Sequence, residues 1–234
     1  ATAGTVGPYP KLDAFETLAA SPLRGVSFAE YFAISPASGA TLAERLGPVI
    51  ERSAMNGPGS RVRLGLQPHA PYSVGPAGYQ LARRMLAQGV PISTHLAETR
   101  EEREFVARGT GSFKAFLASL GLWDDALLET FGAGRTPVEQ LCAPEYASDG
   151  AATPAGAWSG PGAWSGLVAA HLNDVSDSDM ASLARAGIAV AYCPRASAYF
   201  GAPEVFGPHR YREMLAASIP VCLGTDSVVN LPPE

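Results

Sequence analysis

The chain has 234 residues, of which 47% are hydrophobic and 17% are charged, and its formal net charge is -5. This length and apolar content suffice for one large α/β domain with a sizeable core and argue against disorder. Arg makes up 15 of the 17 basic residues, but these form no basic run, so nucleic acid is not an expected partner. No apolar stretch reaches the roughly 18 residues of a membrane span, so a membrane is not an expected partner either.

Strand-like and helix-like segments alternate along the chain. Short continuous apolar runs predict strands, and apolar residues at helical spacing predict helices. The predicted strands cover residues 24–33, 61–67, 90–95, 167–171, 188–193 and 220–226. The predicted helices cover residues 41–55, 75–88, 98–108, 112–120, 177–186 and 209–217.

The stretch from Gly109 to Gly166 interrupts this rhythm. It holds one predicted helix, and its later part is rich in Gly, Ala, Ser and Pro, which predicts a long surface excursion. Trp158 and Trp164 lie in its two AWSG copies and could stack on a planar substrate ring, although loop tryptophans more often pin a loop. We expect one partial catalytic barrel domain over residues 1–234, with this excursion at about 109–166.

The alternation of strands and helices favours a parallel sheet with helical crossovers. Polar candidates stand where predicted strands end, at His69, His95, His171 and Asp226. This is the face on which a TIM barrel builds its active site, so we predict a (β/α)8 barrel. A doubly wound sheet is the alternative, but no phosphate-binding glycine fingerprint follows a predicted strand.

Cysteine usage and the chain ends set further expectations. The three cysteines lack CxxC spacing, which argues against zinc fingers and dithiol redox chemistry, and Cys193 and Cys222 lie in apolar runs as expected of buried thiols. No secretory signal is visible, so a cytoplasmic location is expected. The chain starts at ATAGTV without Met and stops at LPPE, so we expect it to be a piece of a longer protein.

His95, Glu98 and Asp226 form the strongest chemical pattern. A water molecule activated by a metal needs a nearby carboxylate to take and return its proton, and His95 as ligand with Glu98 three residues later would supply both parts. Asp226, in GTDS directly after an apolar run, can bind a metal and accept a proton. A satisfied sheet-edge histidine, a solvated helix-start acid and a helix N-cap are the structural alternatives.

The remaining histidines allow several roles. His171 could bind metal, orient a water molecule or contact substrate. His69, between two prolines in QPHAPYS, could contact substrate or bond the local backbone. His209, in GPHRYRE, is interpreted as a surface residue at a helix start without a role.

QPHAPYS, HLAE, the segment AHLNDVSDSDMASLARAGIAVAYCPRASAYFG and LGTDS together resemble the amidohydrolase superfamily. They are most similar to its cytosine-deaminase-like branch, which holds adenosine-derivative, guanine and cytosine deaminases and triazine chlorohydrolases. The resemblance covers roughly residues 61–230 and leaves the 109–166 excursion unmatched. It implies one zinc or iron ion per chain in a (β/α)8 barrel, with His95, Asp226 and His171 at the metal.

The resemblance also implies catalytic and substrate-binding roles. Glu98 is the proton-shuttling acid, Asp226 the base, and His171 polarises substrate or water. His69 and Asn230 match positions that touch substrate. A small-molecule substrate and a homodimer are the expected partners.

Two departures from the family pattern affect this interpretation. No HxH pair, which supplies two metal ligands from the first strand of the family, occurs in the sequence, so the pair and that strand are expected upstream of Ala1. CPRAS at residues 193–197 replaces CPRSN. The leading hypothesis is hydrolytic deamination of an amino-substituted heterocycle. The alternatives are a dechlorinase, an amide or lactam hydrolase, or a metal-free barrel that binds a ligand or partner.

Overall fold

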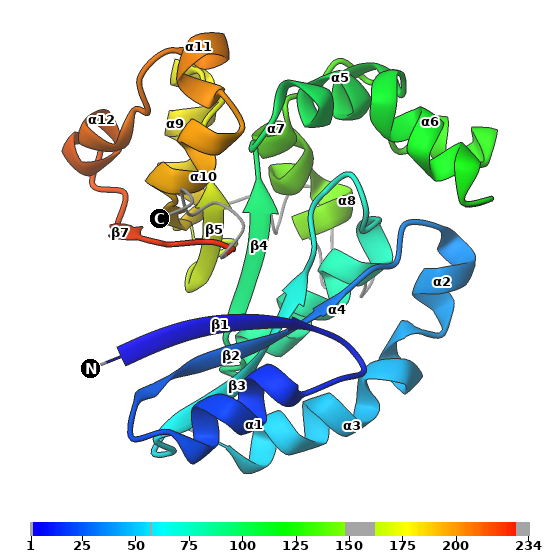
Figure 1. Cartoon of the computed structure of the whole chain (residues 1–234). Helices are drawn as coiled ribbons and strands as arrows, with labels where there is room; N and C mark the ends of the chain where they lie inside the picture. The colour runs from blue at the N-terminus through cyan, green and yellow to red at the C-terminus, as the bar shows by residue number, and fades with distance from the viewer. Residues whose placement is uncertain (1, 57, 148–161, 228–234) are drawn as a thin grey trace.

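The computed structural model describes residues 2–56, 58–147 and 162–227 and shows a curved parallel sheet with helices around it (Figure 1). Seven strands lie side by side in chain order, and each pairs in parallel with the next. The strands are β1 (Thr2–Pro8), β2 (Arg24–Tyr31), β3 (Val62–Pro68), β4 (Ile92–Leu96), β5 (Leu167–His171), β6 (Ala189–Tyr192) and β7 (Val221–Leu223).

Helices connect the parallel strands and cover the sheet, as parallel pairing requires. Figure 1 shows α1 and α3 below β1 to β3, and α5 and α6 above the carboxyl end of β4. The helices are α1 (Asp13–Ala20), α2 (Pro36–Ala40), α3 (Leu42–Met55), α4 (Pro76–Ala87), α5 (Arg100–Arg108), α6 (Gly111–Ser119), η1 (Asp125–Glu129, a 3₁₀ turn), α7 (Pro137–Cys142), α8 (Pro144–Ala147), α9 (Asp177–Ala186), α10 (Pro194–Tyr199), α11 (Ala202–Phe206) and α12 (Tyr211–Ala216).

Burial explains why the apolar runs become strands. Leu64 and Leu66 of β3 are fully buried, and the neighbouring strand residues are buried on both faces, as expected for a parallel strand between helices. Helix α3 buries Leu42, Leu46 and Val49, which recur at helical spacing on one face. Among the described residues, no helix is long and apolar enough to cross a membrane.

Local capping fixes where the helices that follow the site strands begin and end. The Thr99 side chain accepts a hydrogen bond from the Glu102 N–H at the start of α5, and Gly109 ends this helix with φ of 62°. Ser176 and Asp179 form a reciprocal capping box at the start of α9, which ends at Gly187 with φ of 76°. The loops before both helices therefore hold a defined position at the carboxyl edge of the sheet.

The expected α/β fold with a parallel sheet is confirmed, and its seven strands form a half-barrel. Each of the six predicted strands overlaps an observed strand, with boundaries that differ by a few residues. β1 and α1 lie in the opening residues, for which periodicity predicted no individual elements.

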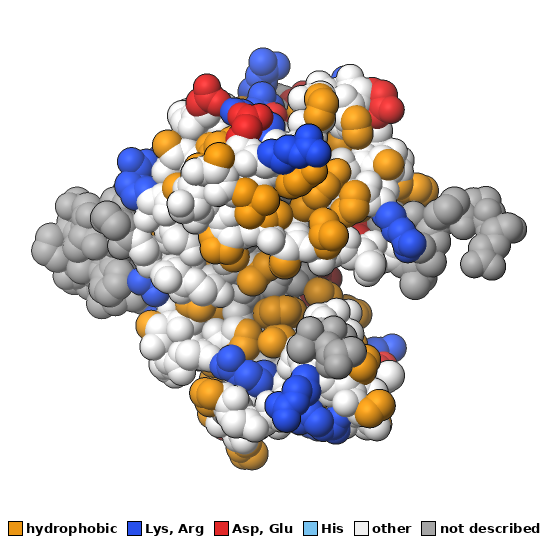
Figure 2. Space-filling view, turned by 90° about the vertical axis from the view of Figure 1, so that its left-hand side faces the viewer, with side chains coloured by type: hydrophobic (Ala, Val, Ile, Leu, Met, Phe, Trp, Pro, Cys, Tyr) orange, Lys and Arg blue, Asp and Glu red, His pale blue; other side chains and the backbone are white. Residues whose placement is uncertain are grey.

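The two edge strands, β1 and β7, lie on the same side of the molecule (Figure 1). Leu223 of β7 is 78% exposed and Val6 of β1 is 46% exposed. Figure 2 views this side and shows hydrophobic side chains gathered across the middle of the face. Cys222 is also exposed on β7, so the prediction of a buried thiol is wrong there, because β7 is an edge strand and no strand of the described residues pairs with its outer side.

The predicted excursion is more helical than its composition suggested. After α6 it forms η1, α7 and α8, and α7 packs against α9 while α8 packs against α4. Trp164 is fully buried in the main core, and its Nε1 donates to the Leu141 carbonyl at 3.2 Å, so it has the pinning role and not the substrate-stacking one. Trp158 lies outside the described residues.

Candidate active site

Polar side chains converge at the carboxyl edge of the sheet, the edge at which a half-barrel of this kind is open to substrate. Each comes from the end of a strand or from the residues directly after it. They are Glu30 in β2, His69 after β3, His95 in β4, Glu98 after β4, His171 at the end of β5, and Asp226 after β7.

The β2–β4 group consists of Glu30, His69 and His95, whose ligand-type atoms all lie within 4.8 Å of one another. The Gln67 amide bridges two of them, since its Nε2 lies 3.0 Å from His95 Nε2 and donates to Glu30 Oε1 at 3.1 Å. His69 Nδ1 lies 2.7 Å from the Ser73 hydroxyl oxygen. Every member of this group therefore has a polar partner within the protein.

The β4–β7 group consists of Glu98, His171 and Asp226, whose ligand-type atoms also lie within 4.8 Å of one another. His171 Nε2 is 3.5 Å from Glu98 Oε1. The His171 ring is buried, and its Nδ1 has no hydrogen-bond partner among the described residues. Asp226 lies at the exposed rim. This group thus combines two carboxylates with a buried imidazole that is only partly satisfied.

A contact between two histidines joins the groups. His95 Nδ1 lies 3.0 Å from His171 Nε2, and the two rings stack with centroids 5.1 Å apart and an interplanar angle of 28°. The His69 ring lies edge-on to the His95 ring at 5.1 Å. The three imidazoles therefore form one continuous row along the carboxyl ends of β3, β4 and β5.

Burial and charge set the protonation of this row. Burial, with help from neighbouring imidazoles, lowers the pKa of His171 to about 3, so its ring is neutral near pH 7. Burial alone would lower the pKa of His95, but its contact with Glu30 and the charge of Glu98 outweigh burial and raise it. Burial also raises the pKa of Glu98, and Asp226 adds to that rise. A neutral His171 supplies no positive charge to Glu98 and Asp226, whereas His95 holds a proton more readily than an ordinary histidine because its pKa is raised.

Strained backbone concentrates at this site. Ala97, His171, Leu172 and Asp226 have φ values between 51° and 76°, a region that residues other than glycine rarely adopt. The Leu172 N–H donates to the Leu96 carbonyl at 2.9 Å and ties the loops after β4 and β5 together. The surrounding structure thus holds His171 and Asp226, two members of the β4–β7 group, in backbone conformations that only a well-packed environment maintains.

Buried Glu102 positions the Glu98 segment. Its carboxylate accepts the N–H groups of Ala97 at 3.0 Å and Glu98 at 2.7 Å. From the other side, Asn173 Nδ2 donates to the Glu98 carbonyl at 3.0 Å. The backbone of Glu98 is therefore fixed through both its N–H and its C=O.

His209 differs from its predicted place on the surface. It is half-buried, its ring stacks on Tyr192 with centroids 3.8 Å apart, and its Nε2 donates to the His171 carbonyl at 2.8 Å. His209 does lie at a helix start, just before α12, but the interpretation as a surface residue is wrong because the segment before α12 bonds the end of β5. His209 contacts the backbone of a site residue.

Two curated proteins are similar to the chain, whereas no family model matches it. It is 29% identical over 181 residues to an aminodeoxyfutalosine deaminase of Deinococcus radiodurans, a match that covers 72% of this chain and 37% of that protein. It is 27% identical over 173 residues to a 5′-deoxyadenosine deaminase of Methanoregula boonei, covering 73% of this chain and 29% of that protein. The chain thus spans about a third of the length of these relatives.

Solved structures share the fold. An adenosine deaminase from Xanthomonas campestris with bound zinc superposes with a TM-score of 0.57 at 19% identity, over 93% of this chain and 39% of that one. A triazine hydrolase from Arthrobacter aurescens gives a TM-score of 0.64 at 20% identity, over 96% of this chain and 44% of that one. The resemblance to the amidohydrolase superfamily is confirmed.

The donor set of the site fits a metal cofactor. Imidazole nitrogens and carboxylate oxygens are the usual ligands of zinc and related transition metals. Glu98 and Asp226 bring two carboxylates within 4.8 Å of neutral His171, an arrangement that a cation stabilises. The β2–β4 group fits less well, because the amide nitrogen of Gln67 already lies against both Glu30 and His95.

The structure thus brings five predicted site residues to one edge of the sheet: His69, His95, Glu98, His171 and Asp226. Asn230 lies outside the described residues. His95 and Asp226 fall in different groups and are linked through His171, so their sharing of one ion stays a prediction. Sequence reasoning missed Glu30, Gln67 and Glu102. An acid or amide near the end of a predicted strand was the available signal for Glu30 and Gln67.

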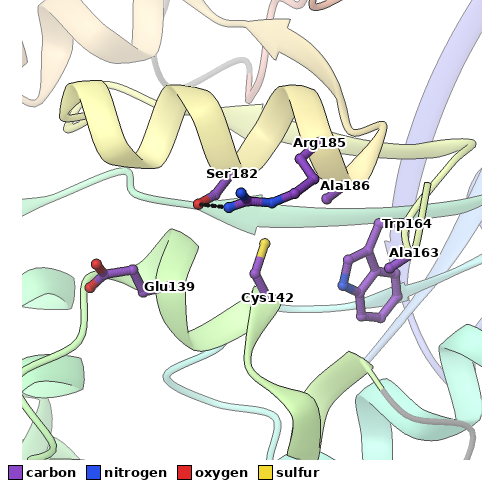
Figure 3. A pocket seen from close by; sticks show the side chains of 7 residues that line it. All are labelled: Glu139, Cys142, Ala163, Trp164, Ser182, Arg185 and Ala186. Carbon is purple, nitrogen blue, oxygen red and sulfur yellow. Dashed lines mark hydrogen bonds between the residues drawn. The ribbon is translucent and has the colours of Figure 1, made fainter. Parts of the chain in front are cut away.

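A separate cavity of about 430 Å³ lies between α7 and α9 (Figure 3). Cys142 and Trp164 line it, together with Arg185, which donates to the Ser182 hydroxyl. Burial raises the pKa of the Cys142 thiol to about 11, so this thiol stays protonated and unreactive near pH 7. None of the predicted site residues lines this cavity, and we do not assign the chemistry to it.

Proposed function

We propose that this chain forms the catalytic barrel domain of a metal-dependent hydrolase that deaminates an amino-substituted heterocycle, of the purine, pyrimidine or nucleoside class. The observation that carries the proposal is the β4–β7 group next to His95 at the carboxyl edge of the sheet. The names of the two curated relatives, both deaminases of adenosine-type compounds, favour this class of substrate. The cytoplasmic location and the homodimer stay predictions.

In this proposal His95, His171 and Asp226 hold one divalent ion, zinc or alternatively iron. When bound, such an ion acts as a Lewis acid that lowers the pKa of a water molecule and polarises the substrate. Gln67 and Glu30 hold the His95 ring through its Nε2 and leave its Nδ1 facing His171. Partners of this kind orient ligating histidines in metal sites.

In this proposal Glu98 and Asp226 each carry out a different proton transfer. Glu98 protonates the ring nitrogen next to the carbon that bears the amino group, which makes this carbon more electrophilic. Asp226 takes a proton from the attacking water and delivers it to the amino group. Water oxygen forms the new C–O bond, the hydroxyl of the adduct gives its remaining proton back to Glu98 as it becomes a carbonyl, the C–N bond breaks, and ammonia leaves, so atoms and protons balance. His69, at the β3 side of the row, contacts the substrate, and Asn230 is a further substrate-binding candidate.

We also propose that a further β/α unit closes the half-barrel between β7 and β1 and brings the missing pair of histidine ligands. The exposed side chains of Leu223 and Val6 on the two edge strands support it. In a barrel, a strand at this position would add its end residues to the same carboxyl edge as His95, His171 and Asp226.

The test is hydrolysis by the full-length natural protein that contains this chain, loaded with zinc. Adenosine, 5′-deoxyadenosine and guanine are offered separately, and released ammonia is measured, with chloride release from a chlorotriazine as the competing assay. We expect ammonia from at least one amino-heterocycle, loss of activity after chelation, and its return with zinc. Chloride release without ammonia would favour the dechlorinase, and no reaction by a metal-replete protein would reject the proposal.

A further inference from the structure

A second cavity adjoins the candidate active site. It has a volume of about 450 Å³, within the range of small-molecule pockets. Its walls come from three segments, residues 32–38 after β2, residues 69–73 after β3, and residues 113–122 in and after α6. All three follow strands at the carboxyl edge, and Figure 1 shows α2 and α6 on the same side of the molecule. We call it the apolar pocket.

His69 belongs to both the apolar pocket and the β2–β4 group. The centroid of its ring lies 5.1 Å from that of His95 and 4.6 Å from that of Phe32, a pocket residue. Tyr72 also packs edge-on against His69 at 5.5 Å and stacks on Phe113 at 4.3 Å. The His69 ring is therefore shared by the apolar pocket and the β2–β4 group, so the pocket adjoins the row of histidines.

The walls of the apolar pocket are hydrophobic and uncharged. Phe32, Phe116 and Leu120 line it and are each 50–60% exposed, so apolar surface faces solvent at the pocket. No Lys, Arg, Asp or Glu is among the described residues that line it. Its polar groups already have partners, since Ser35 and Ser38 form the capping box of α2 and Ser73 bonds His69. Lys114, the cation of α6, lies over the Trp123 ring.

We propose that the apolar pocket binds an uncharged aryl substituent carried by the substrate, while the amino-heterocycle lies at the β4–β7 group. This inference deepens the proposed function and rests on it. Aromatic side chains that line a cavity favour planar rings, which they contact edge-on or in offset stacks. A phosphate at the same position would lose its hydration without finding a cation. The chain therefore selects substrates by their apolar end as well as by their amino group.

Binding of three matched probes to the full-length, zinc-loaded protein tests the inference. Adenosine, 5′-deoxy-5′-(phenylthio)adenosine and adenosine 5′-monophosphate differ only at the 5′ position, and isothermal titration of the zinc-loaded Glu98→Gln variant, whose turnover is expected to be at least ~10²-fold slower, gives each Kd. We expect the phenylthio compound to bind about ten- to a hundredfold more tightly than adenosine, the range for burying one aromatic group. The monophosphate should bind no more tightly than adenosine.

A pair of charge-introducing variants localises the effect. Leu120→Arg adds a cation at the pocket, whereas Leu215→Arg adds one at a similarly exposed residue of α12 that does not line it. Leu120→Arg should remove most of the phenylthio preference and strengthen monophosphate binding by about tenfold. Leu215→Arg should change neither. Far-UV circular dichroism confirms that both variants are folded.

The outcomes separate this inference from the proposed function. If no probe is deaminated but the phenylthio preference exists and Leu120→Arg removes it, the pocket assignment stands and the deaminase proposal fails. If adenosine is deaminated and the three probes bind equally, or if Leu215→Arg acts like Leu120→Arg, the pocket assignment is overturned.

Discussion

The two acid–histidine groups at the carboxyl edge contain the same kinds of side chain but differ in how well they are satisfied. In the β2–β4 group, Gln67 lies between Glu30 and His95, and Ser73 pairs with His69. In the β4–β7 group, Glu98 and Asp226 approach a neutral, buried His171 whose Nδ1 lacks a partner among the described residues. A buried ring nitrogen without a hydrogen-bond partner, beside two carboxylates, is the kind of position at which functional sites are found, whereas side chains that bond one another mainly fix the geometry of the site.

The largest expected effect comes from Glu98→Gln, which keeps the size of the side chain and removes its ability to carry a proton. We expect kcat to fall by at least ~10² while metal content stays unchanged. Metal is measured by elemental analysis and kcat by ammonia release. Glu101→Gln, in the first turn of α5, is the control and should leave both the metal content and kcat unchanged. A Glu98→Gln enzyme of near-normal rate contradicts the proton-transfer role.

The second-largest expected effect is on zinc affinity, which should fall more for a substitution in the β4–β7 group than for one in the β2–β4 group. Asp226→Asn removes a charged ligand of the β4–β7 group and should weaken zinc binding more than a hundredfold. Glu30→Gln removes only a partner of His95 and should weaken it by about tenfold, the lower range for residues that orient a ligand. Competition with a chromogenic chelator measures both affinities. The reverse order would assign the ion to the β2–β4 group.

The free energy of unfolding should depend on pH through Glu102, whose carboxylate accepts hydrogen bonds from the N–H groups of Ala97 and Glu98. Burial raises its pKa to about 7 from an ordinary value of 4.5, so the folded state binds its proton more tightly than the unfolded chain. The favourable contribution is complete below about pH 4.5 and is lost as the pH rises through 7, a change of roughly 3 kcal/mol. Urea unfolding between about pH 5 and pH 8 measures the slope.

Glu102→Gln should flatten that slope, because the amide does not titrate in this range. Glu101→Gln, which keeps Glu102, should retain the slope of the original protein. An unchanged slope in Glu102→Gln would show that other groups cause it.

The sequence predicted the parts of this molecule that local pattern determines. Apolar runs indicated six of the seven strands, and residues at strand ends indicated His69, His95, Glu98, His171 and Asp226. Helix α7 also had a local signal, since Thr136-Pro137-Val138-Glu139 is a capping box with Pro at the first turn, but the glycine-rich composition around it obscured this.

The remainder depends on contacts between distant segments. Glu30 and Gln67 meet His95 only because β2, β3 and β4 pair in a particular register, which no local pattern specifies. Glu102 bonds only nearby residues, the N–H groups of Ala97 and Glu98, but its burial there comes from the packed fold, so its sequence position resembles that of an ordinary acid in the first turn of a helix. The side chains that hold site residues in place are therefore harder to predict from sequence than the site residues themselves.

The smallest expected effect concerns His209, the residue that sequence reasoning placed on the surface. His209→Phe keeps the stack on Tyr192 and removes the hydrogen bond to the His171 carbonyl, which should lower the free energy of unfolding by about 1 kcal/mol. Because the bond is to the backbone of His171 and not to its ring, kcat should fall by less than tenfold. Thermal and urea unfolding measure the first value and ammonia release the second. A loss of kcat as large as that of Glu98→Gln would move His209 from support of the β4–β7 group into its chemistry.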